Sequence, residues 1–143
     1  MKILLTGSSG QLGKAIISSK PADYELLVPN KNKLNLSDKV NCLNYVEKYK
    51  PEFIINSGAF TNVDLAENKS DLCYSINTEA PCIFANELKK YGGKLIQIST
   101  DYVFDGSKKS PYKVQDLRKP ISIYGDSKAL SEEKLEKILK PNN

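Results

Sequence analysis

Short apolar runs alternate with helix-like patterns along this chain. Four runs bounded by glycine, proline or asparagine predict β-strands, and between them apolar residues recur every three or four positions, which predicts helices. Pro81 should bend the third helical stretch or lie in the first turn of a new helix. The expected strands cover residues 2–6, 24–28, 53–56 and 94–99, and the expected helices cover 11–19, a segment capped by Ser37-Asp38, 70–91 and a segment from about Tyr124.

Strands and helices alternate throughout. Apolar strands separated by crossover helices are typical of a parallel sheet that is covered on both faces. We therefore expect an α/β fold with a Rossmann-like, doubly wound parallel sheet of about four strands, in the order 3-2-1-4.

Composition removes several classes of function. With 40% hydrophobic and 27% charged residues, the chain has the balance of a globular protein, and no apolar run suits a membrane span or a signal peptide, so we expect no membrane partner and a cytoplasmic protein. The chain has no histidine, which excludes His-based triads and most zinc and haem sites. We expect no metal, and we interpret Cys42, Cys73 and Cys82 as reduced core thiols. The net charge of +4 comes from scattered lysines with Arg118 as the one arginine, so we expect no nucleic-acid partner.

A glycine-rich turn joins the first expected strand to the first expected helix. Residues 6–13 read TGSSGQLG, with glycines at intervals of three. Gly7 would allow a tight exit from the strand, Gly10 would let a pyrophosphate approach the backbone, and Gly13 would let the helix pack close to the sheet. The free N–H groups of the first helical turn attract an anion. The pattern predicts a dinucleotide site, and the alternative interpretation is a purely structural turn.

The end of the second strand bears on the choice of cofactor. Residues 28–33 read VPNKNK and lack the acidic residue that commonly binds the adenine ribose. Asn30, with Lys31 or Lys33 nearby, could accept a 2′-phosphate, which favours NADPH over NADH. The alternative is that these lysines are solvated loop residues.

A tyrosine and a lysine lie four residues apart in the last helical segment. Tyr124 and Lys128 would share one face of a helix, where an ammonium group stabilises the phenolate and brings proton transfer by tyrosine into range. Ser99 and Thr100, at the carboxyl end of the fourth strand, could supply a hydroxyl to a substrate oxygen. A Y-x-x-x-K spacing alone is common by chance, but its order after the glycine turn and the Ser-Thr strand end favours a catalytic site.

These motifs together resemble the extended short-chain dehydrogenases, and within them the dTDP-4-dehydrorhamnose reductases. The strings at 51–67 and 99–106 are more specific to this subgroup than the glycine turn is. The matching segments are TGSSGQLG at 6–13, PEFIINSGAFTNVDLAE at 51–67, STDYVFDG at 99–106 and IYGDSK at 123–128.

The resemblance implies a role for each matching residue. Thr100, Tyr124 and Lys128 would form the catalytic set, with Tyr124 giving its proton to the oxygen of a 4-keto sugar nucleotide while NADPH or NADH supplies the hydride. The substrate would be a dTDP-sugar and the product dTDP-rhamnose. The implied cofactor contacts are Gly10, Gln11 and Leu12 at the pyrophosphate and Ala59, Phe60 and Thr61 beyond the third strand.

Members of this family continue for roughly as much chain again. We therefore expect residues 1–143 to be an NAD(P)-binding domain without the C-terminal strands and substrate-binding region, which keeps the cofactor half-site and turns substrate over inefficiently. The open edge of the fourth strand would then be available for pairing, as in a homodimer. Two alternatives remain: a non-catalytic NADP-binding regulatory subunit, like the methionine adenosyltransferase beta subunit, or a sugar-nucleotide epimerase or dehydratase.

Overall fold

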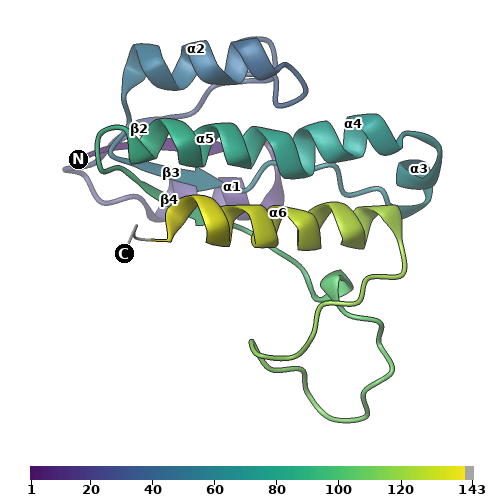
Figure 1. Cartoon of the computed structure of the whole chain (residues 1–143). Helices are drawn as coiled ribbons and strands as arrows, with labels where there is room; N and C mark the ends of the chain where they lie inside the picture. The colour runs from purple at the N-terminus through teal and green to yellow at the C-terminus, as the bar shows by residue number, and fades with distance from the viewer. Residues whose placement is uncertain (141–143) are drawn as a thin grey trace.

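The computed structural model describes residues 1–140, which form a four-stranded parallel sheet flanked by helices (Figure 1). Each expected strand and helix is present, with the second and fourth strands shorter than expected. In chain order the elements are β1 (Lys2–Thr6), α1 (Gln11–Ser19), β2 (Glu25–Leu27), α2 (Lys39–Tyr49), β3 (Phe53–Asn56), α3 (Val63–Asn68), α4 (Ser70–Tyr74), a π-helical turn (Ser75–Glu79), α5 (Ala80–Lys89), β4 (Lys94–Gln97), a 3-10 turn (Asp101–Val103) and α6 (Ile123–Leu139).

The fold class is confirmed, but the expected strand order is wrong. The strands lie in the order β2-β1-β3-β4 instead of 3-2-1-4. Ile54 and Asn56 of β3 are fully buried, so β3 belongs inside the sheet, between β1 and β4. In β2 only three residues are paired and none is fully buried, which suits an edge strand. The chain therefore crosses back over β1 after β2, and residues 29–38 contain no strand.

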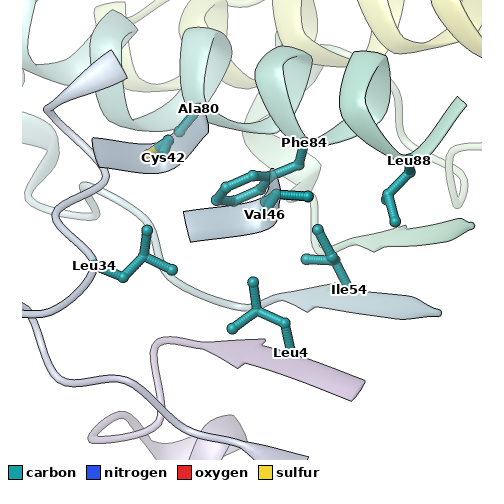
Figure 2. Packing of buried hydrophobic residues seen from close by; sticks show 8 residues of the cluster. All are labelled: Leu4, Leu34, Cys42, Val46, Ile54, Ala80, Phe84 and Leu88. Carbon is teal, nitrogen blue, oxygen red and sulfur yellow. The ribbon is translucent and has the colours of Figure 1, made fainter. Parts of the chain in front are cut away.

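This order fixes the faces on which the helices lie. The connection from β1 to β2 and the connection from β2 to β3 run in opposite directions, and right-handed crossovers then put α1 and α2 on opposite faces. On the face with α2 and α5, Figure 2 shows Val46 and Phe84 packed over Leu4 and Ile54. The alternate side chains of β1 are buried as well. Side chains therefore pack on both faces of the sheet at β1.

Local sequence explains where the helices begin. Asp38 caps α2 by accepting a hydrogen bond from the Asn41 amide, as expected, and Ser122 caps α6 by accepting one from Gly125. Pro81 lies in the first turn of α5, directly after the π-helical turn, as expected. The α4 and α5 helices are joined by the π-helical turn and run as one helical stretch (Figure 1).

The sheet is more exposed at β4 than at β1. Within residues 1–140, β4 pairs only with β3, and Ile96 is 48% exposed. The segment between β4 and α6 extends away from the sheet as a long irregular excursion (Figure 1), in which Val114 and Leu117 are almost fully exposed. No helix in the described part of the chain is long and apolar enough to cross a membrane.

Candidate active site

A crevice of about 290 Å³ lies at the carboxyl ends of β1 and β3. The chain leaves β1 toward one face of the sheet and β3 toward the other, which makes this the topological switch point where open α/β sheets bind ligands. Three groups of residues line the crevice: the glycine turn, the segment after β2 and the loop after β3. They are Thr6, Gly7, Ser8, Ser9, Pro29, Asn30, Lys31, Leu34, Asn35, Leu36, Gly58, Ala59 and Ile76.

A side chain would meet different obstacles at the three glycine positions of the turn. Gly7 has a positive φ of 67°, and a side chain there would meet the backbone of Gly58. A side chain at Gly13 would collide with the Gly7 carbonyl and Ser8, so Gly13 allows α1 to pack against the turn. Gly10 is different, because a Cβ there would lie 3.3 Å from the nearest atom, the Gly7 oxygen. The protein's own packing requires Gly7 and Gly13, whereas at Gly10 an added Cβ would be crowded by one backbone oxygen only.

The N-terminus of α1 has no side-chain cap. Gly10 occupies the N-cap position, and the first intrahelical bond runs from Lys14 N–H to the Gly10 carbonyl. The N–H groups of Gln11, Leu12 and Gly13 therefore have no intrahelical acceptor. Asp38, Asn62 and Ser122 cap α2, α3 and α6 with side-chain oxygens. With the adjoining crevice, this uncapped end fits a dinucleotide pyrophosphate.

Buried polar side chains link the strand ends beneath the crevice. The Thr6 hydroxyl donates to Asn56 Oδ1 and accepts from the Gly58 amide at 3.0 Å. The Asn56 amide donates to Gln97 Oε1 at 2.7 Å. These bonds connect β1, β3 and β4 at one level, so the floor of the crevice is held in a fixed register.

The segment after β2 contributes residues that could distinguish NADPH from NADH to the lining of the crevice. Asn30 and Lys31 both line the crevice, and no acidic residue lines it. The Asn30 side chain also accepts from the Lys33 amide at 3.1 Å and so shapes the turn. Lys33 itself does not line the crevice. The arrangement suits a 2′-phosphate contacted by Lys31.

The tyrosine and lysine lie on the first turns of α6. Lys128 is 3% exposed, and its ammonium group donates to the Ile98 carbonyl at 2.5 Å. The half-buried Tyr124 ring packs edge-on against Tyr102, with centroids 5.5 Å apart. Thr100 caps the 3-10 turn by accepting from the Tyr102 amide. All three predicted catalytic residues thus lie around the carboxyl end of β4.

Burial changes the acidity of Lys128. Loss of hydration lowers its pKa to about 8, while the carboxylate of Glu132 acts in the opposite direction. A lysine with a pKa near 8 can carry or release a proton close to neutral pH. This is a property expected of a group that supports proton transfer by a neighbouring tyrosine.

The predicted residues fall into two groups. Gly7, Asn30 and Ala59 line the crevice, whereas Thr100 lines a larger groove of about 600 Å³ between β4 and α6. Phe60 and Thr61 continue the loop after β3 without lining the crevice. Both groups lie at the carboxyl ends of neighbouring parallel strands, but they do not line the same cavity.

Asn77 holds the loop after β3, and the sequence motifs did not reveal it. Its side chain is buried, accepts from the Phe60 amide at 2.8 Å and donates to the Phe60 carbonyl at 3.0 Å. It also donates to Ser127 Oγ at 3.0 Å, beside Lys128. The available signal was an asparagine on a helical stripe that includes Cys73 and Ala80, where a buried amide needs partners.

The cysteines are free and have packing roles. Cys42 and Cys73 are buried and Cys82 is half-buried, and burial raises the pKa of Cys42 to about 12. Thiols of this kind are inert near neutral pH. Within residues 1–140, no group of three or more Cys, Asp or Glu side chains is placed to hold a metal ion.

Known proteins resemble the chain over most of its length. SpsK of Bacillus subtilis, a spore coat polysaccharide biosynthesis protein, is 39% identical over 92% of this chain and 47% of its own length. A dTDP-4-dehydrorhamnose reductase of Aggregatibacter actinomycetemcomitans is 35% identical over 92% of this chain and 45% of its own. The bovine methionine adenosyltransferase 2 subunit beta is 30% identical over 89% and 40%. The chain spans less than half the length of these curated relatives.

Solved structures agree with the sequence relatives. A dTDP-4-dehydrorhamnose reductase of Clostridium acetobutylicum superposes with a TM-score of 0.91 at 36% identity, over 96% of this chain and 50% of that one. The corresponding protein of Bacillus anthracis, solved in complex with NADP, gives 0.89 at 34% identity, over 96% and 49%. The model of the RmlD substrate binding domain matches residues 1–142. This chain belongs to the RmlD substrate binding domain family.

Proposed function

We propose that this chain supplies the NADPH-binding and proton-donating part of a 4-keto sugar-nucleotide reductase that converts dTDP-4-dehydrorhamnose to dTDP-rhamnose. One observation carries the proposal: buried Lys128 lies four residues after Tyr124 on α6, with its ammonium group at the end of β4. Lysine is rarely fully buried, so the burial of Lys128 beside Tyr124 favours a role in proton transfer. The names of the relatives support the choice of substrate.

The residues fit the cofactor at three points. The uncapped start of α1 and the absence of a side chain at Gly10 suit the pyrophosphate, and Ala59 lines the crevice. Lys31 suits a 2′-phosphate. Bound NADPH would supply the hydride for C4 of the keto sugar.

The protein's own groups would handle the proton. Tyr124 donates its phenolic proton to the forming alkoxide, and Thr100 orients that oxygen. The Lys128 ammonium stabilises the resulting phenolate, which then recovers a proton from solvent. In this scheme the chain binds the cofactor and moves one proton, and the hydride comes from outside the protein.

Tyr124→Phe tests the catalytic assignment. We expect NADPH binding to change less than about twofold and NADPH oxidation with dTDP-4-dehydrorhamnose to fall by about a hundredfold or more, because the substitution removes the proton donor and leaves the ring. Tyr102→Phe is the matched control, since this exposed neighbour packs on the same ring. Unchanged turnover in Tyr124→Phe would reject the role, and wild-type dissociation constants favouring NADH would reject the choice of NADPH.

A regulatory subunit is the second candidate, supported by the 30% identity to a methionine adenosyltransferase subunit. It predicts NADP binding without sugar-nucleotide reduction and with a catalytic partner that co-purifies. An epimerase or dehydratase instead predicts NAD that stays bound on dilution. Release of the cofactor together with net NADPH oxidation separates the reductase from both alternatives.

A further inference from the structure

Glu132 contacts two segments that are distant from it in the sequence. It lies on α6 one turn after Lys128, and its side chain is 26% exposed. One carboxylate oxygen accepts from the Ser99 hydroxyl, and the other accepts from Arg118 Nε at 2.6 Å. Both oxygens are therefore engaged, each by a different part of the chain.

The contact with Ser99 lies next to the proposed site. Lys128 binds the carbonyl of Ile98, Glu132 binds the side chain of Ser99, and Thr100 follows directly. Two successive residues after β4 are thus held by two successive turns of the helix that carries Tyr124. These two bonds join the residues directly before Thr100 to this helix.

Glu132 is also the negative charge that acts on Lys128. The groups acting on the Lys128 ammonium are Glu132 on its own helix and the Cys73 thiol of α4. Burial raises the pKa of Cys73, so this thiol is neutral near pH 7. Tyr124 shares the helix face and is the proposed proton donor. Glu132 therefore supplies the negative charge that favours the ammonium form.

We propose that Glu132 is a positioning residue, which holds the 98–100 segment against α6 and keeps Lys128 in its ammonium form. The proposal rests on the proposed function for its catalytic consequence. Its structural part, the effect of Glu132 on Ser99 and Lys128, can be measured without any turnover.

Three variants separate the hydrogen bond between Ser99 and Glu132 from the effect of the Glu132 charge on Lys128. Glu132→Gln removes the charge, Ser99→Ala removes the tie and leaves the charge, and Glu136→Gln is the matched control. Glu136 also accepts from Arg118, but it is 54% exposed and contacts neither Ser99 nor Lys128. Glu136→Gln therefore matches the loss of an Arg118 ion pair in Glu132→Gln and leaves the contacts with Ser99 and Lys128 in place.

NMR titration of the Lys128 side chain, with backbone amide shifts of residues 98–100, gives the direct readout. We expect Glu132→Gln to lower the pKa of Lys128 by about 0.5 or more. We expect Ser99→Ala to move the 98–100 amides without a comparable change in that pKa. Equal results for Glu132→Gln and Glu136→Gln would overturn the proposal, and so would unchanged 98–100 amides in Ser99→Ala.

The pH dependence of kcat in the reductase assay is a second measurement, which would not change if Glu132 had only a structural role. We expect Glu132→Gln to shift the alkaline limb of the kcat profile to lower pH by the same amount as the pKa, and Glu132→Asp to restore part of the shift. A kcat profile that stays in place while the pKa moves overturns the catalytic part. If the wild-type chain binds no NADPH, the proposed function fails, while the titration still decides whether Glu132 controls Lys128.

Discussion

The crevice at β1 and β3 and the margin formed by β4 and α6 are organised by different means. In the crevice, glycine backbone and neutral polar side chains determine the shape: Gly7 and Gly13 permit close approach, and the Thr6 hydroxyl links two strand ends. At the margin, charged side chains such as Lys128 and Glu132 make the connections across an edge that has no further strand within residues 1–140. The neutral contacts of the crevice are independent of pH, whereas the contacts at the margin depend on charges and therefore on pH.

Gly13→Ala, which tests the close packing of the glycine turn, has the largest expected effect on stability. The added methyl group would collide with the backbone of Gly7 and Ser8, so we expect the free energy of unfolding to fall by about 3 kcal/mol, measured by urea denaturation. Gly10→Ala is the matched control, because its Cβ would be crowded by a single backbone oxygen at 3.3 Å instead of overlapping three backbone atoms, and we expect it to cost about 1 kcal/mol. Its effect should instead be weaker NADPH binding. Equal stability losses in both variants would contradict the distinction between packing and ligand glycines.

Lys128→Met tests whether charge governs the margin. The folded pKa of about 8 lies below the ordinary value of 10.5, so the unfolded chain binds more protons between these pH values. The stability of the wild type should therefore rise with pH across this interval by about 3 kcal/mol relative to Lys128→Met.

The comparison between the two proteins isolates Lys128, because burial also changes the pKa of other groups and raises that of Tyr45 and Tyr91. Lys134→Met, which alters an exposed lysine of the same helix, should follow the wild-type curve. Parallel curves for the wild type and Lys128→Met would show that burial does not penalise the ammonium group.

The elements and the glycine turn could be predicted because their signals are local. The Asp38 cap, the position of Pro81 and the strand at 53–56 each follow from a few neighbouring residues. Strand order could not be derived in the same way, because it depends on which strand needs burial on both faces. The full burial of Ile54 decides this, and it becomes visible only once the sheet is assembled.

The supporting residues of the site were missed for a related reason. Asn77 meets Ser127 across 50 residues of sequence, and Glu132 meets Ser99 across 33. No spacing rule covers such pairs. The motif placed Tyr124 and Lys128 on one helix, but the burial of Lys128 comes from tertiary packing.

Arg118→Ala tests the margin with the smallest expected change in stability. Arg118 binds Glu132 and Glu136, but its side chain is 30% exposed, and ion pairs of this kind contribute at most about 1 kcal/mol. We therefore expect little loss of global stability and a local effect instead, with faster amide hydrogen exchange in residues 105–121, because Arg118 ties this irregular segment to α6.

The segment has other attachments that should persist in this variant. The Lys119 amide binds the Val103 carbonyl at 2.8 Å, and the Phe104 ring stacks on Tyr112. Exchange should therefore rise most near residue 118. Lys137→Ala, which removes the ion pair to Glu133 on the same helix, should leave exchange in 105–121 unchanged. If both variants loosen the segment equally, α6 itself has been weakened, and the margin would depend on the helix as a whole rather than on the Arg118 tie.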